Sequence, residues 1–250
     1  MVQQIVDFPV KKREANKPHA LILGVNGTIG NAISKQLFAT HSIVGVARDI
    51  HNASHLTTLV QSDYDEVHLP ELVNTLRNIT DTYDLIINCI GTLHGDGLFP
   101  EKRLLEITKK QLTEYFAVNS ILPAVLIKYL APLMPRKQRC VYANLSAMIG
   151  SIGDNHIGGW YGYRASKAAL NMIVKTASIE LARTHPKLAI VAIHPGTTKS
   201  KLSEPFTDKV DPDNLYTPQL TATRLVHVLS TLSAKDTGGF FKWDGSKIEW

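Results

Sequence analysis

Tyr163 and Lys167 are the residues of this sequence whose types and spacing point most directly to chemistry. Residues four apart lie on one face of an α-helix, and residues 161–183 show the apolar spacing of a helix. An ammonium group beside a phenol stabilises the phenolate and lowers the phenol pKa from about 10. Such a phenol can donate or accept a proton during hydride transfer. We therefore predict a proton-transferring pair at the start of this helix.

The segment before this helix supplies further polar and aromatic candidates. A strand ends in Asn144-Leu145-Ser146, and a loop of small residues follows over 150–159. We predict that Ser146 donates a hydrogen bond to a substrate carbonyl, as preorganised oxyanion donors do. His156 lies in this loop and is a candidate substrate contact. Trp160 and Tyr161 are interpreted either as a wall of the substrate pocket or as core residues.

A glycine-rich turn follows the first apolar strand and precedes a helix. Glycine permits a tight turn and a close backbone approach to a diphosphate, while the helix start offers free N–H groups. The alternative is an ordinary strand–helix turn. The predicted cofactor-binding residues of the turn are Gly24, Asn26, Gly27, Thr28, Ile29 and Gly30.

Arg48 follows the second predicted strand, whose end faces the adenosine ribose in dinucleotide-binding folds. An arginine there suits a 2′-phosphate, so Arg48 favours NADP(H), with NAD(H) as the other possibility. Asp49 comes next and suits free hydroxyl groups instead. A solvent-exposed Arg48–Asp49 pair without a binding role is the alternative interpretation.

These candidates need a scaffold, and the hydrophobic pattern predicts one in which strands and helices alternate. Near-continuous apolar strands separated by helices indicate a parallel sheet covered on both faces. We therefore predict an α/β fold with a doubly wound, mostly parallel sheet, which places ligands beyond the carboxyl ends of its strands. The predicted strands are 19–23, 42–47, 85–90, 140–145, 188–193 and 240–243, and the predicted helices are 29–38, 111–134 (with a kink at Pro123) and 161–183.

Composition limits the remaining possibilities. The 250 residues, 44% of them hydrophobic, suit one catalytic domain over 19–250 with an N-terminal arm over 1–18. A net charge of +5 comes partly from Lys11, Lys12, Arg13 and Lys17, interpreted as a solvated arm and not as a nucleic-acid site. His51 and His55 are interpreted as surface residues, so no metal is expected. The two cysteines are interpreted as reduced thiols. The sequence has no long apolar run, which predicts no membrane association. It also has no secretory signal pattern, and we therefore expect a cytoplasmic location.

Taken in order, these motifs resemble the short-chain dehydrogenase/reductase family from about His19 to the C-terminus. Residues 88–91 resemble the family's Asn-Asn-Ala-Gly stretch, and His194-Pro195-Gly196 its Pro-Gly turn near the nicotinamide. The resemblance implies that Lys167 holds the nicotinamide ribose and that Asn119 holds a water linking Lys167 to solvent. It adds Asp63, or alternatively Asp65, as an adenine contact. The cofactor-binding residues implied in addition are Asn88, Gly91, Tyr163, Lys167, Pro195, Gly196 and Thr198.

Within the family, residues 150–171 and 239–250 resemble the C-factor-like and sniffer-type carbonyl reductase branch. Three departures stand out. Thr28 occupies a glycine position of the first turn, and the interval from Arg48 to Asp63 leaves little room for a helix. Ala147 rather than Ser146 lies three residues before Gly150, which leaves open whether Ser146 or a neighbour has the serine role.

The predicted function is an NAD(P)(H)-dependent interconversion of a small-molecule carbonyl and alcohol. A dinucleotide-binding regulatory or signalling protein with little turnover is the alternative. The resemblance also implies a homodimer or homotetramer, with Leu126 and Leu130 on the docking face.

Overall fold

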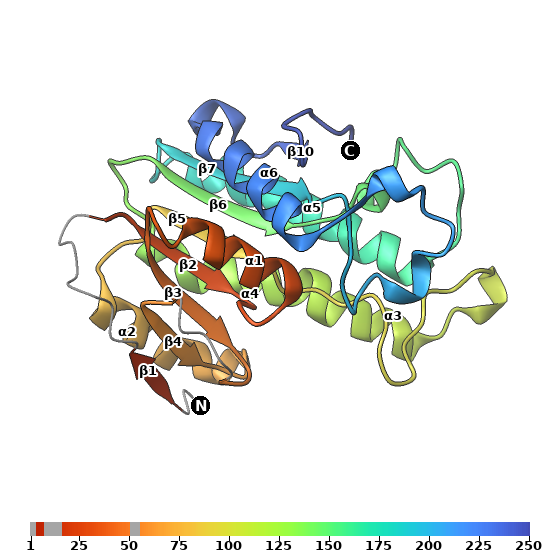
Figure 1. Cartoon of the computed structure of the whole chain (residues 1–250), viewed down its shortest axis with the longest axis horizontal. Helices are drawn as coiled ribbons and strands as arrows, with labels where there is room; N and C mark the ends of the chain where they lie inside the picture. Colours follow the sequence, from red (N-terminus) through yellow and green to blue (C-terminus); the bar gives the residue numbers. More distant parts are fainter. Residues whose placement is uncertain (1–3, 8–16, 51–55) are drawn as a thin grey trace.

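The computed structural model describes residues 4–7, 17–50 and 56–250. Its centre is an eight-stranded sheet with the strand order β1-β4-β3-β2-β5-β6-β7-β10 (Figure 1). Seven strands are parallel, and β1 pairs with β4 in the antiparallel direction. The strand bounds are β1 Ile5–Asp7, β2 His19–Leu23, β3 Ser42–Ala47, β4 Thr58–Gln61, β5 Leu85–Asn88, β6 Cys140–Leu145, β7 Leu188–His194 and β10 Phe240–Lys242. The predicted doubly wound α/β fold is confirmed.

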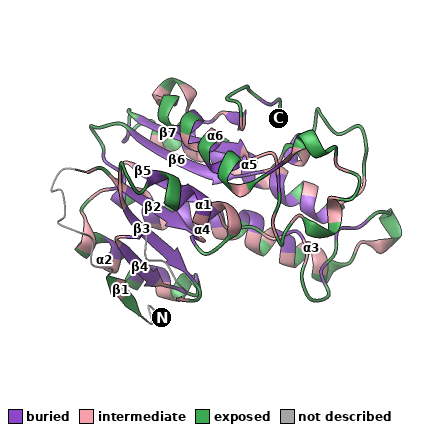
Figure 2. Ribbon diagram, viewed as in Figure 1, coloured by how far each residue is buried: buried purple, intermediate pink, exposed green. Residues whose placement is uncertain are grey.

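Helices cover both faces of this sheet. The helices α1 (Thr28–Leu37) and α6 (Pro218–Thr231) pack on one face, and α2 (Leu69–Ile79), α4 (Leu122–Leu130) and α5 (Tyr161–Leu181) pack on the other. Successive strand residues feed the two cores alternately: Ala20 and Ile22 face α1 and α6, whereas Leu21 and Leu23 face α2 and α4. Strands buried on both faces explain the near-continuous apolar runs of the sequence (Figure 2).

The long apolar region 109–133 is a succession of helical segments. It contains α3 (Lys109–Phe116), a π-helical turn (Ala117–Ile121), α4 and a short 3-10 turn (Ala131–Leu133). The predicted irregularity is present, but it precedes Pro123. Pro123 has no N–H, so it cannot donate to the carbonyl four residues earlier (residue 119) or to the one five residues earlier (residue 118). The wider π-helical turn lies where these hydrogen bonds are missing.

Among the described residues, this region is the one helix long and apolar enough to cross a membrane by length and composition. Leu126, Ile127 and Leu130 of α4 instead belong to the core on the sheet. The prediction that Leu126 and Leu130 form a docking face is therefore wrong, because both are buried within the chain itself.

The interval between β3 and β4 shows no helix in its described residues, as its length predicted, while residues 51–55, with His51 and His55, lie outside the described part. Leu56, just before β4, packs against β3: a Cβ at Gly45 would come within 2.8 Å of Leu56 Cδ1.

The N-terminal arm contains an unpredicted element, because Ile5–Asp7 forms β1 and Asp7 Oδ1 accepts a 2.7 Å hydrogen bond from Thr58 Oγ1. The basic residues 11–13 lie outside the described residues.

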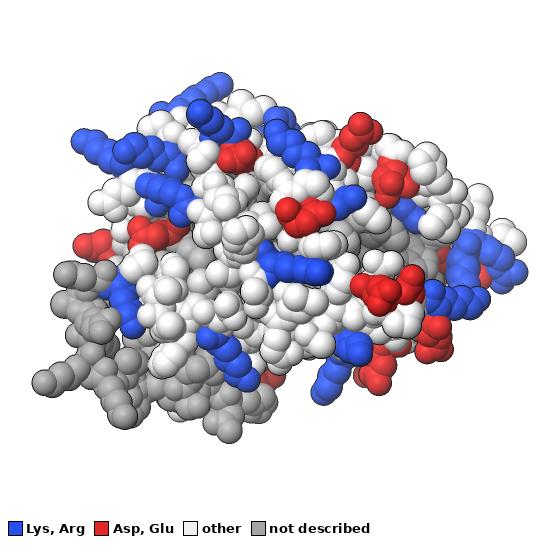
Figure 3. Space-filling view, turned by 45° about the horizontal axis from the view of Figure 1, so that its top comes forward, with Lys and Arg blue, Asp and Glu red and all other residues white. Residues whose placement is uncertain are grey.

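Charges of both signs are spread over the face drawn in Figure 3, with acidic side chains between separate groups of Lys and Arg. Both cysteines are free thiols: Cys140 is buried and Cys89 half-buried. In the described part of the chain, no three His, Cys, Asp or Glu side chains are placed to hold a metal ion.

Candidate active site

Tyr163 and Lys167 lie together on the inner face of α5, at the carboxyl ends of β5 and β6. Both are buried, and Lys167 Nζ stands 5.9 Å from the centre of the Tyr163 ring. The ammonium donates a 3.0 Å hydrogen bond to the carbonyl of Leu145, the last residue of β6. A Cβ on Gly91 would lie 3.4 Å from Lys167 Nζ and 3.4 Å from Asn119 Oδ1. The predicted pair, Tyr163 and Lys167, thus lies next to Gly91 and Asn119, the two residues that the resemblance implies.

Burial dominates the ionisation of this pair. Burial raises the pKa of Tyr163 well above its usual value, and no opposing effect of Lys167 accompanies it. Burial also lowers the pKa of Lys167 to about 8, because an ammonium group loses hydration inside the protein. The predicted lowering of the phenol pKa is therefore wrong for the protein alone, which holds Tyr163 as a neutral phenol.

Asn119 occupies the π-helical turn, and its side chain clamps the loop that follows β5. Its Oδ1 accepts from the Thr92 N–H at 2.9 Å, and its Nδ2 donates to the Thr92 carbonyl at 2.9 Å. Nδ2 also contacts Ser166 Oγ at 3.1 Å. Its amide is thus engaged by the protein. Pro123 removes the i+4 donor to the Asn119 main-chain carbonyl, which makes this carbonyl the candidate for the predicted water.

Ser146 points away from this centre. Its Oγ donates a 2.7 Å hydrogen bond to Asn171 Oδ1 on α5. The neighbouring Ala147 instead packs on the cluster that contains Tyr163. Successive residues of an extended chain point in opposite directions, so the prediction that Ser146 offers its hydroxyl to the substrate is contradicted by this geometry. The residue that borders the reactive tyrosine has no hydroxyl group.

The glycine turn has the shape that close approach of a diphosphate requires. Gly24 has φ +73°, and a Cβ on Gly30 would lie only 2.5 Å from the Gly24 carbonyl oxygen. Gly27 caps α1 without a side-chain hydrogen bond, and Thr28, Ile29 and Gly30 form its first turn. The N–H groups of a first helical turn have no partner within the helix, so they remain available to an anion. The exposed Asn26 donates from Nδ2 to the Asp49 carbonyl and ties this turn to the end of β3.

Tyr64 reinforces the same turn and was not predicted from the sequence. Its buried hydroxyl accepts from the Gly24 N–H at 3.1 Å and donates to the Val46 carbonyl at 2.8 Å. Its backbone has φ +62°, an uncommon conformation for a bulky residue. Tyr64 thus joins the ends of β2, β3 and β4. A lone tyrosine between two aspartates carries no sequence pattern that would have marked it.

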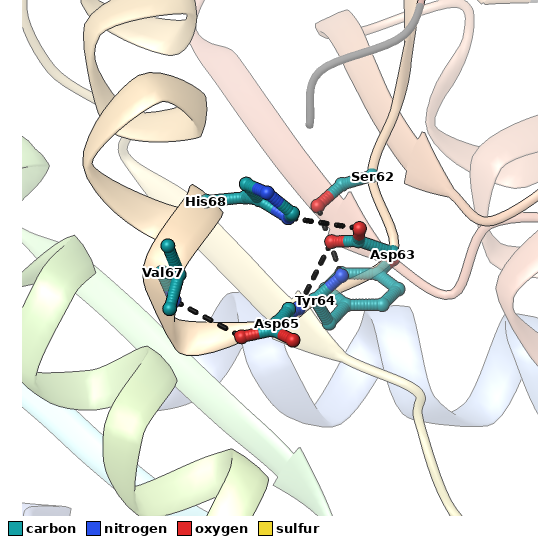
Figure 4. A network of polar contacts seen from close by, with 6 residues as sticks. All are labelled: Ser62, Asp63, Tyr64, Asp65, Val67 and His68. Atoms are coloured by element: carbon teal, nitrogen blue, oxygen red, sulfur yellow. Dashed lines mark hydrogen bonds and ion pairs between the residues drawn. The ribbon is translucent and has the colours of Figure 1, made fainter.

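Asp63 and Asp65 flank Tyr64 in the network of Figure 4, where the two carboxylates have different partners. Asp63 Oδ1 accepts from the Asp65 N–H at 3.0 Å, and its Oδ2 lies 2.9 Å from His68 Nδ1. Asp65 Oδ1 accepts from the Val67 N–H and caps a short 3-10 helix, Glu66–His68. The hydrogen bond from the Asp65 N–H is the main reason that the pKa of the exposed Asp63 is lowered. Both carboxylates thus have partners within the chain, and which of them contacts the adenine stays a prediction.

The remaining predicted cofactor residues lie at the same edge of the sheet. Arg48 is exposed directly after β3. Asn88 is buried, bonded to Asn144 Oδ1 and to the Ile90 N–H. Pro195 and Gly196 follow β7, and Gly196 has φ +78° with no room for a Cβ beside the ring of Tyr216. Thr198 is buried, and its hydroxyl pairs with Thr221 at 2.8 Å.

Aromatic rings gather next to Tyr163. The Trp160 ring centre lies 6.1 Å from that of Tyr163 and 4.9 Å from that of Phe206. His94, from the loop after β5, reaches within 5.7 Å of Phe206. Trp160 is half-buried and packs on the cluster that contains Tyr163, whereas Tyr161 and His156 are exposed. That Trp160 also forms a wall of a substrate pocket stays a prediction. Phe206 and His94 were missed because their loops have no repeating pattern.

The comparisons with known proteins agree with this geometry. A family model described as short chain dehydrogenase matches residues 18–211. The C-signal protein of Myxococcus xanthus is 27% identical over 172 residues, a match that covers 68% of this chain and 95% of that protein. An uncharacterized oxidoreductase of Saccharomyces cerevisiae is 30% identical over 172 residues, covering 66% of this chain and 64% of that protein. Another, from Schizosaccharomyces pombe, is matched over 60% of its length at 27% identity.

Solved structures show the same fold. The carbonyl reductase Sniffer of D. melanogaster superposes with a TM-score of 0.81 at 23% identity, covering 94% of this chain and 100% of that one. An NADPH-bound carbonyl reductase from chicken fatty liver gives the same TM-score, identity and coverage. With the family model matched over most of the chain and the motifs in their expected order, this protein belongs to the short-chain dehydrogenase family of oxidoreductases and resembles its C-signal and sniffer-type members.

Proposed function

We propose that this protein is an NADP(H)-dependent oxidoreductase that interconverts a carbonyl group and an alcohol on a small molecule. The observation that supports the proposal most is the burial of Tyr163 and Lys167 side by side, at the sheet edge that also carries the glycine turn. A proton donor and a dinucleotide cradle at one edge suit hydride transfer coupled to proton transfer.

The residues at this edge fit a dinucleotide. Gly24 and Gly30 form a tight turn in which a Cβ at either position would press against the turn itself or against Ile90. The first turn of α1 offers its N–H groups to the diphosphate. In this proposal Arg48 binds a 2′-phosphate and Asp63 contacts the adenine, while Lys167 and Pro195-Gly196 contact the nicotinamide end. When bound, the nicotinamide supplies or accepts the hydride.

The protein's own residues supply the proton and the position. In reduction, the neutral Tyr163 phenol donates its proton to the carbonyl oxygen; in oxidation, the phenolate accepts it from the alcohol. The neighbouring Lys167 ammonium stabilises the Tyr163 phenolate once the phenol proton has been transferred to the substrate. The Asn119 carbonyl holds a water that returns protons to Lys167 from solvent. Trp160 and Phe206 exclude bulk water from the tyrosine hydroxyl.

The test follows the absorbance of NADPH at 340 nm with a panel of aldehydes, ketones and quinones. Turnover of at least one substrate is expected, and Tyr163→Phe should abolish it while leaving NADPH binding within about twofold. Arg48→Ala should weaken NADPH more than NADH. Turnover that persists in Tyr163→Phe would exclude the proposed proton donor, and equal losses for both cofactors would exclude a 2′-phosphate contact at Arg48.

A second candidate is a dinucleotide-binding regulatory or signalling protein with little turnover. It is favoured by the alanine that borders Tyr163 where a hydroxyl donor would assist the carbonyl. This candidate predicts tight NADPH binding with no oxidation by any member of the panel.

A further inference from the structure

We propose that Glu101 is a positioning residue for Tyr163: its buried carboxylate, supplied from a distant loop, caps the N-terminus of α5 and holds the first turn of that helix in place. The proposal rests on the proposed function, in which Tyr163 transfers the proton. Glu101 lies in the loop between β5 and α3, some way along the chain from the helix that it contacts.

Two N–H groups at the start of α5 have Glu101 as their partner. The Glu101 carboxylate Oε2 accepts from the Gly162 N–H at 3.1 Å, and the Glu101 carbonyl accepts from the Trp160 N–H. The first hydrogen bond of the helix itself is the one from the Arg164 N–H to the Trp160 carbonyl. Gly162 is therefore one of the donors that a helix cannot satisfy internally, and Glu101 supplies what a local cap normally provides.

The helix needs this external cap because its own sequence offers none. Trp160 stands at the N-cap position without a side-chain hydrogen bond, and the first turn carries no acidic residue. A carboxylate near the N-terminus also complements the helix dipole. Glu101 is 1% exposed, so its hydrogen bond to the helix start is shielded from competing water.

The backbone before α5 has a conformation that would not persist unaided. Gly158, Gly159 and Trp160 have φ +71°, +66° and +55°, and a tryptophan in this region is strained. Arg164 holds the first two by donating to their carbonyls, and Glu101 holds the third. This conformation turns the Trp160 ring toward Tyr163 and Phe206.

The space around the carboxylate leaves little freedom. A Cβ at Gly162 would lie 2.5 Å from the Tyr115 ring and 3.0 Å from Glu101 Oε1. The Tyr115 ring stacks edge-on with Tyr163 at 6.1 Å, and its hydroxyl donates to the Leu93 carbonyl at 2.7 Å. Glu101 Oε1 itself has no hydrogen-bond partner. A buried carboxylate with one free oxygen is costly to maintain, which argues that its contact with α5 serves function.

The experiment compares Glu101→Ala, Glu101→Gln and Glu101→Met, with Glu106→Gln as the matched control. Glu106 is a glutamate of the same loop that bonds the Lys102 N–H and Arg103 without touching α5. Glutamine keeps an acceptor for Gly162, whereas methionine fills the space without one. Each variant is assayed for NADPH affinity, for kcat at saturating NADPH, and for hydrogen exchange of the Gly162 amide.

We expect Glu101→Ala and Glu101→Met to lower kcat about tenfold and to speed Gly162 exchange about tenfold, with NADPH affinity within about twofold. Glu101→Gln should recover most of both properties, and Glu106→Gln should match the unmodified protein. Recovery by methionine would reduce Glu101 to a space filler and overturn the proposal, as would unchanged kcat in a variant whose Gly162 amide exchanges faster. If the unmodified protein shows no turnover, the proposed function fails, and unchanged Gly162 exchange in Glu101→Ala would separately refute the cap.

Discussion

At the scale of single residues, burial determines what Tyr163 and Lys167 can do. Spacing in the sequence indicated that the two side chains share a helix face, and the structure shows that they do. Spacing did not indicate how little water reaches them. Burial favours the neutral form of each group, so the cofactor-free protein holds a neutral phenol beside an amine whose pKa is about 8.

The low pKa of Lys167 predicts a pH-dependent stability that a Lys167→Met variant should lack. In the folded protein the amine loses its proton near pH 8, whereas in the unfolded chain it does so near about 10.4. Between these values the unfolded chain binds more protons, so the free energy of unfolding rises with pH. Below pH 8 the buried ammonium destabilises the fold, by up to about 3 kcal/mol.

Urea unfolding of the cofactor-free proteins measures this effect. Lys167→Met should be the more stable protein at pH 7, and its advantage should shrink as the pH is raised from 8 toward 10. Other titrating groups are common to both proteins and cancel in the difference. Parallel stability curves for the two proteins would show that the Lys167 pKa is not lowered in the folded state.

The serine at the end of β6 shows where sequence reasoning failed. The motif order predicted a hydroxyl group near Tyr163 and left open whether Ser146 or a neighbour carried it. A shift of one residue reverses a side chain's direction, and apolar patterning does not reveal such a shift at a strand end. The structure directs Ser146 to Asn171 and Ala147 to the tyrosine cluster.

Exchanging these two positions should reveal which one borders the reaction. Ser146→Ala should reduce stability by about 1 kcal/mol through the lost bond to Asn171. Its kcat should fall far less than the roughly 100-fold loss that follows removal of a transition-state donor. Ala147→Ser should raise kcat about tenfold, since it adds a hydroxyl beside Tyr163. Steady-state kinetics at saturating NADPH measures both values of kcat. A 100-fold loss of kcat in Ser146→Ala would show that Ser146, and not position 147, contacts the substrate carbonyl.

At the scale of elements, periodicity located six strands of the sheet and three helical regions, but it did not locate β4, α2 or α6. The strands β2, β3 and β6 begin and end at the predicted residues, and α1 and α5 differ from prediction by at most two residues at an end. Elements that depend on long-range pairing were missed. β1 forms because Ile5–Asp7 pairs with the edge of β4. A segment of three residues is too short to show the alternating pattern that predicts a strand.

Tyr64 belongs to this second class, because its importance comes from joining three strand ends. We predict that Tyr64→Phe weakens NADPH binding about tenfold, because it removes the hydroxyl that reinforces the direct 2.9 Å bond between the Gly24 N–H and the Val46 carbonyl. The value of kcat at saturating NADPH should stay within about twofold, because Tyr64 lies at the glycine turn and away from Tyr163. Titration of NADPH fluorescence measures the affinity.

Tyr83→Phe is the matched control for Tyr64→Phe. The Tyr83 hydroxyl is also buried and also donates to a main-chain carbonyl, that of Leu76, at 3.0 Å. Both variants should lose similar stability, but only Tyr64→Phe should lose affinity for NADPH. Equal affinity losses in the two variants would mean that the effect is a general loss of stability and not a loosened glycine turn.

At the scale of the whole molecule, the face formed by α4 and α5 still exposes apolar side chains after the core has packed. A groove of about 540 Å³ runs along this face, lined mostly by apolar residues such as Ile127, Met172 and Ile173, with Lys128 and Glu180 among its polar residues. Met172 is 65% exposed, and Ile121 and Ile179 are also exposed apolar side chains of these helical segments. We therefore expect any contact between subunits to lie on this face, and not at Leu126 and Leu130, which are buried in the core.

We predict that the protein self-associates through this face and that Met172→Glu prevents it. A carboxylate in a closed apolar interface loses hydration without a partner, so the variant should sediment as a 27.6 kDa monomer while the unmodified protein sediments as a dimer or larger. Leu105→Glu, which changes an exposed apolar residue on a loop outside this face, is the control and should leave assembly intact. Sedimentation velocity at several concentrations gives the masses. A monomeric unmodified protein, or a Met172→Glu protein of unchanged mass, would remove this face from assembly; a monomer that still binds NADPH would show that each subunit carries a complete cofactor site.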